Sequence, residues 1–89
     1  MEIDVYDSYA KTVDGRLMHF DVFIKSGSDP DIALRRGQEW LISIGENPVG
    51  LDQSRCNFCH SEVANSDVQR EVEQKGFFIF QMEGCPTPV

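Results

Sequence analysis

Positively charged residues and long apolar runs are both scarce in this 89-residue sequence. Lysine and arginine total 8 against 15 aspartate and glutamate residues, which leaves a formal net charge of −7. A surface with this balance repels phosphate backbones and anionic lipid headgroups. No stretch approaches the ~18 consecutive apolar residues that a membrane-spanning helix requires. The composition therefore predicts neither a nucleic-acid partner nor a membrane partner.

The beginning of the chain also lacks the features of an export signal. It reads MEIDVYDSY, which is acidic and has neither a basic n-region nor an apolar h-region. We therefore expect a cytoplasmic protein. In that reducing compartment the three cysteines would be thiols. Metal binding, redox chemistry or simple burial then outranks a structural disulfide.

Internal repeats, low-complexity segments and linkers are absent as well. The length is that of one domain, just above the ~70–80 residues below which a core usually needs a disulfide or a metal. We expect a single domain over residues 1–85, followed by a flexible tail over residues 86–89.

Two segments near the N-terminus alternate between their two faces with the two-residue period of a strand. They are EIDVYDSYA at residues 2–10 and LMHFDVFI at residues 17–24. The Asp-Gly pair at residues 14–15 favours a tight turn, because both residue types tolerate positive φ. A two-residue loop would place Tyr9 opposite Phe20. We therefore predict a β-hairpin in that register.

The rest of the chain alternates helices and strands. Residues 28–45 read as a capped helix, and residues 65–76 as a shorter helix that ends at a glycine. A weak strand is expected over residues 51–58. The run FFIFQM at residues 77–82 fits a strand that is covered on both faces. The order ββαβαβ predicts an α+β fold, a small sheet with an N-terminal β-hairpin and two helices packed on the sheet.

The stretch CNFCHSE at residues 56–62 concentrates the side chains that carry chemistry. Cys56 and Cys59 have C-x-x-C spacing, but positions three apart in a flat strand point to opposite faces. Their sulfurs converge only if this stretch forms a turn. Zinc is the cofactor that such a turn would hold. The candidate zinc ligands are Cys56, Cys59, Cys85 and His60, with His19 and Glu62 as alternates.

Three other interpretations fit the same stretch. A thiol redox protein or sensor would use Cys56 and Cys59 as a reactive pair, with His60 lowering the pKa of one thiol. CNFCH also matches the C-x-x-C-H pattern of haem attachment, although the strand-rich chain and the missing export signal disagree with it. The cysteines could also be packed as small apolar side chains.

His19 and Asp21 share one strand face, and such a pair can orient a general base. In the predicted register they would stand opposite Ala10 and Ser8. Because no serine nucleophile stands in a recognisable setting, a hydrogen-bonded surface patch is the favoured interpretation. We expect the domain to bind a ligand or partner rather than to act alone as an enzyme.

Five stretches between Val5 and Cys85 carry a family resemblance. They are VYDSYAKTVDG, MHFDVF, EWLISIG, CNFCHSE and GFFIFQMEGC. With them the chain resembles a small bacterial family that is known only as a domain of unknown function. The resemblance implies a cytoplasmic, single-domain α+β protein, and it transfers no activity, cofactor or catalytic residue.

The function predicted from these observations is that of a small zinc-binding or partner-binding module centred on CNFCHSE. A thiol redox protein and a metal-free acidic interaction domain are the alternatives. A protein is the expected partner. The chain itself would be a monomer or a weak homodimer, because a small sheet has edges that can pair.

Overall fold

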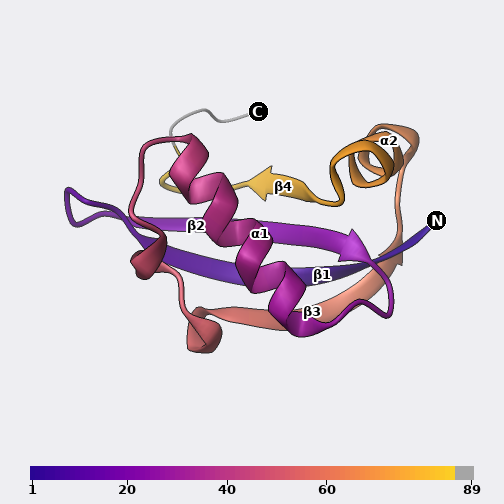
Figure 1. Ribbon diagram of the computed structural model, residues 1–89, viewed down its shortest axis with the longest axis horizontal. Coiled ribbons are helices and arrows are strands. Elements are labelled where there is room, and N and C mark those ends of the chain that lie inside the picture. The colour runs from indigo at the N-terminus through magenta and orange to yellow at the C-terminus, as the bar shows by residue number, and fades with distance from the viewer. Residues whose placement is uncertain (86–89) are drawn as a thin grey trace.

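The computed structural model describes residues 1–85, which form a four-stranded antiparallel sheet and two α-helices (Figure 1). The strands follow the order β3-β1-β2-β4 across the sheet. The predicted α+β class and the order ββαβαβ are confirmed. The elements are β1 (Glu2–Lys11), β2 (Leu17–Lys25), α1 (Pro30–Ser43), the 3₁₀ turns η1 (Pro48–Gly50) and η2 (Gln53–Arg55), β3 (Cys56–Val63), α2 (Ser66–Lys75) and β4 (Phe78–Gln81).

The two helices lie on opposite faces of the sheet, because alternate residues of each strand feed two separate cores. Phe20 and Val22 of β2 pack under α1 with Leu41, whereas Phe23 packs under α2 with Val72. Figure 1 shows α1 crossing the sheet and α2 lying at one end of it. One face is therefore covered along much of its length, and the other only near α2.

Helix α1 begins and ends where the sequence predicts. The Asp29 side chain caps it by accepting a hydrogen bond from the Asp31 N–H, and Pro30 occupies the first turn. The helix stops before Gly45, which has a φ of 83°. Gly37 allows a close approach, since a Cβ there would lie 2.6 Å from Leu51 Cδ2.

Helix α2 is short and has one buried stripe. The Asn65 side chain caps it by accepting a hydrogen bond from the Val68 N–H, and Gly76 ends it in the left-handed conformation. Val68 and Val72 are its buried residues. Within residues 1–85, neither α2 nor any other helix is long and apolar enough to cross a membrane.

The predicted hairpin register is wrong by one residue. Tyr9 stands opposite His19, not opposite Phe20. The loop spans residues 12–16 and is closed by the Thr12 N–H, which donates to the Arg16 carbonyl oxygen at 2.8 Å. A one-residue shift exchanges the faces of one strand relative to the other. Asp21 therefore stands opposite Asp7 instead of Ser8.

Two strand predictions also need correction. The strand expected over residues 51–58 is β3, which begins at Cys56 because the preceding residues form η1 and η2. The strand expected to be covered on both faces is β4, which lies at the edge of the sheet and leaves Phe80 49% exposed. The expected flexible tail lies outside the described residues.

Candidate functional site

The uncovered part of the sheet changes from apolar to polar along β1. Ile3 and Val5 are buried beneath α2. Asp7 and Tyr9 follow on the same face, because strand residues two apart point the same way. Neither of them is fully buried. The polar positions therefore begin where the cover provided by α2 ends.

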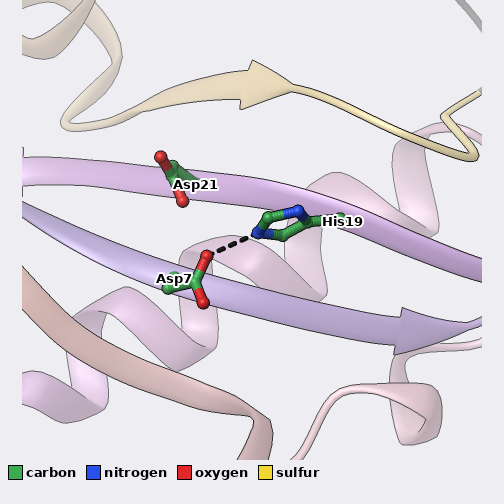
Figure 2. Close-up of side chains that lie close together, drawn as sticks. All are labelled: Asp7, His19 and Asp21. Atoms are coloured by element: carbon green, nitrogen blue, oxygen red, sulfur yellow. Dashed lines mark hydrogen bonds and ion pairs between the residues drawn. The ribbon is translucent and has the colours of Figure 1, made fainter.

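Asp7, His19 and Asp21 converge on this open part of the sheet. Asp7 comes from β1 and stands directly opposite Asp21 of β2, and His19 lies two residues before Asp21 on the same face. One potential ligand atom from each residue lies within 4.8 Å of the other two. Figure 2 shows the closest contact, in which His19 Nε2 lies 2.5 Å from Asp7 Oδ1. These three residues are called the Asp7–His19–Asp21 cluster below.

His19 is held in place on several sides. The ring of Tyr9, its cross-strand neighbour, stacks on the imidazole with a centroid separation of 4.3 Å and an interplanar angle of 8°. The backbone of His19 is also fixed. Its amide N–H donates to the Glu83 carbonyl oxygen at 2.8 Å, and its carbonyl oxygen accepts from the Met82 amide N–H at 3.0 Å. The imidazole is therefore positioned before any ligand arrives, which lowers the entropy cost of binding.

The two carboxylates compete for ionisation. Partial burial, the charge of Asp7 and a hydrogen bond with Asp7 all act to raise the pKa of Asp21, which reaches about 6. The nearby His19 and His60 act in the opposite direction. Two adjacent carboxylates share a proton when no cation balances them. Below a pH of about 6 the folded protein therefore holds a proton in the place where a cation would be favoured.

The structure does not bring Cys56 and Cys59 together as zinc ligands. Cys56 is 3% exposed, lies in the core under α1 and accepts a hydrogen bond from Ser8 Oγ at 3.5 Å. Burial raises the pKa of its thiol. Cys59 is exposed and falls at a β-bulge, where β1 offers it no partner. The segment is therefore a bulged strand, not the turn that zinc binding by both sulfurs requires.

The other predicted ligands lie in three different settings. Cys85 is half-buried and its thiol donates to the His19 carbonyl oxygen at 3.5 Å, and burial raises the pKa of this thiol. His60 is exposed and pairs with Glu62, with 3.1 Å between His60 Nε2 and Glu62 Oε2. Within residues 1–85, the group of potential ligands that meets at one point contains His19 and no cysteine.

Asp7 is the cluster residue that sequence reasoning missed. Its strand was predicted, but the wrong register placed it away from His19 and Asp21. The signal that could have found it is the polar interruption of an apolar face, since Asp7 follows Ile3 and Val5. In the observed register this interruption coincides with Asp21 on the neighbouring strand.

The fold and the cluster together define a small α+β protein with a polar, partly open sheet face. The model of a protein family described as a domain of unknown function (DUF2024) matches residues 1–82, and the chain belongs to this family. The NMR structure of protein NE1680 from Nitrosomonas europaea is 46% identical and superposes with a TM-score of 0.84. The match covers 96% of this chain and 99% of that one. No curated protein matches the chain.

Proposed function

We propose that this protein is a small metal-binding module whose ion lies between Asp7, His19 and Asp21. One observation carries the proposal: an imidazole nitrogen and two carboxylates, supplied by two strands, lie within 4.8 Å of one another. Zinc accepts this combination of nitrogen and oxygen donors, as do other divalent first-row ions. The proposed site therefore lies on the open sheet face rather than on CNFCHSE.

The electrostatics of the cluster also favour a divalent ion. Asp21 retains a proton up to a pH of about 6 because it is partly buried and Asp7 is close. A bound cation would replace that proton and balance both carboxylates. Binding should therefore release protons and become stronger as the pH rises from 5 to 7.

The cluster supplies three ligands and leaves room for more. A tetrahedral zinc ion with three protein ligands keeps one position for water or for a group from another molecule. His60 of β3 is the candidate for a fourth protein ligand, because it stands opposite Val5 and therefore lies on the sheet face that carries Asp7. To reach the ion, its imidazole would have to leave Glu62.

The thiol redox alternative receives less support from the environment of the cysteines. A reactive pair needs one thiol with a lowered pKa, whereas burial raises the pKa of Cys56.

The expected cytoplasmic location stays a prediction, and so does the zinc site on the cysteines.

The proposal is tested by titrating the metal-free protein with Zn²⁺ in an isothermal calorimeter at pH 7. We expect one ion per chain, and an affinity that falls at least about tenfold in Asp7→Asn and in His19→Ala. Cys59→Ser is the matched control, because Cys59 is exposed and lies outside the cluster. The proposal fails if Cys59→Ser loses the ion, or if Asp7→Asn binds zinc like the unsubstituted chain.

A further inference from the structure

The free edge of β4 lies in a groove between the two helices. The groove has a volume of about 280 Å³. Trp40 and Ser43 of α1 line one side, and Glu71 and Lys75 of α2 line the other. Residues of β4 itself, among them Ile79 and Gln81, line it as well. This space is called the β4-edge groove below.

Two residues of β4 direct their backbone groups into this groove. The Met82 N–H donates to the His19 carbonyl oxygen, so Met82 faces β2. In an antiparallel pair alternate residues face the partner strand. Phe80 therefore also faces β2, whereas the N–H and C=O groups of Ile79 and Gln81 point away from it. β4 is the last strand of the described sheet, so no described strand pairs with these groups.

One residue that lines the groove carries an unsatisfied acceptor. Gln81 Oε1 is buried and has no hydrogen-bond partner among the described residues. Gln81 stands opposite Phe20, which places it on the sheet face that α1 covers. Buried polar atoms without a partner are rare in native proteins, and each one needs an explanation. A donor on a bound molecule would provide it if the Gln81 side chain rotates towards the groove on binding, because Oε1 is itself buried in the free protein.

We propose that the β4-edge groove binds an extended peptide segment of a partner protein, which adds to the sheet as a fifth strand. An extended backbone carries N–H and C=O groups at the spacing of the free edge, and this is the basis of β-augmentation. Alternate side chains of the segment would point towards the two helices. Those facing Trp40 would be apolar, with one donor for Gln81 Oε1, and those facing Glu71 and Lys75 would be polar.

The occupant is a segment of a partner rather than a second copy of this chain. The β4 edge of a second copy would carry its own α1 and α2 on the two sides of its groove. Two such edges would bring four helices to a gap about 280 Å³ in volume. The net charge of −7 on each copy also opposes their approach. A single extended segment avoids both problems.

The probe is a displayed library of octapeptides in which apolar and polar positions alternate. We expect enriched peptides to shift the amide NMR signals of Ile79 and Gln81 in the unsubstituted chain. Ser43→Arg should weaken their binding at least about tenfold, because a long charged side chain at this exposed position would fill the groove. Ile42→Arg is the matched control, since Ile42 is the exposed neighbour on the same helix and does not line the groove.

A second variant separates a binding role of Gln81 from a structural one. Gln81→Leu should bind the same peptides more weakly while unfolding at a higher temperature than the unsubstituted chain. Three results would overturn the proposal: no enrichment, binding that Ser43→Arg leaves unchanged, or a peptide-free dimer that Ser43→Arg dissociates. The last result would identify a second copy as the occupant. Asp7→Asn should leave peptide binding unchanged, because Asp7 does not line the groove.

Discussion

Asp7 of β1 and Asp21 of β2 stand directly opposite each other, with His19 beside them on the same face of the sheet. Like charges in cross-strand positions are destabilising. The cluster thus places repulsion on the open part of the sheet. Partial burial, together with the adjacent charge of Asp7, raises the pKa of Asp21 to about 6.

Asp21→Asn should stabilise the metal-free protein at pH 7. The folded-state pKa of Asp21 is about 6 and the unfolded value is 3.8, so the folded state binds more protons between these values. Stability contributed by this group is therefore present at pH 4 and is lost as the pH rises through 6. After discounting for solvent screening, we expect a gain of about 1 kcal/mol from the substitution at pH 7.

Urea unfolding of Asp21→Asn and of the unsubstituted chain at pH 4 and pH 7 measures this effect. The difference between the two proteins should be smaller at pH 4, where Asp21 is protonated in the folded state. An equal difference in the free energy of unfolding at pH 4 and pH 7 would show that the titration of Asp21 does not affect stability. With zinc present at pH 7, the unsubstituted chain should become more stable than Asp21→Asn, because an amide is a poorer zinc ligand than a carboxylate.

Cys56→Ser should destabilise the protein by about 1–3 kcal/mol, because a hydroxyl would replace a thiol that packs in the core. The loss should be the same with and without a chelator, as no metal is bound by Cys56 in this account. Cys59→Ser is the exposed counterpart and should leave the free energy of unfolding nearly unchanged. Chemical unfolding with and without EDTA checks both variants. A loss in Cys56→Ser that appears only without EDTA would indicate a metal at the cysteine.

Gln81→Leu should raise the free energy of unfolding by about 1 kcal/mol, because it removes a buried oxygen that has no partner among the described residues. Gln38→Leu is the contrasting variant. The Gln38 side chain donates to the Leu51 carbonyl oxygen at 3.0 Å, so its loss should destabilise the protein. Thermal and urea unfolding of the two variants should therefore move in opposite directions. A lower stability in Gln81→Leu would contradict the view that this oxygen is unsatisfied.

Local sequence signals were sufficient to predict most of the secondary-structure elements and their order. Asp29 and Pro30 mark the beginning of α1, and Gly76 ends α2 in the left-handed conformation that glycine favours. Such features act over a few residues, so they can be interpreted without knowledge of the tertiary structure. The strand alternation of β1 and β2 is local in the same sense.

The candidate site could not be predicted in the same way, because it depends on register. The Asp-Gly pair at residues 14–15 suggested a two-residue loop, but the Thr12 N–H closes a wider loop onto Arg16. That difference of one position decides which residue faces Asp21. The β-bulge at Cys59 has a similar effect, since it depends on pairing with β1 and has no local signature. The motif CNFCHSE therefore predicted a shared site for two cysteines that lie in different environments in the folded strand, one buried and one exposed.

X-ray absorption at the zinc edge of the loaded protein tests the central claim most directly. Zinc–nitrogen and zinc–oxygen bonds are roughly 2.0–2.2 Å long, whereas zinc–sulfur bonds are roughly 2.3 Å long and scatter more strongly. Binding by Asp7, His19 and Asp21 predicts a first shell of nitrogen and oxygen with no sulfur. A shell that contains sulfur would contradict this account and would indicate that the cysteines bind the ion.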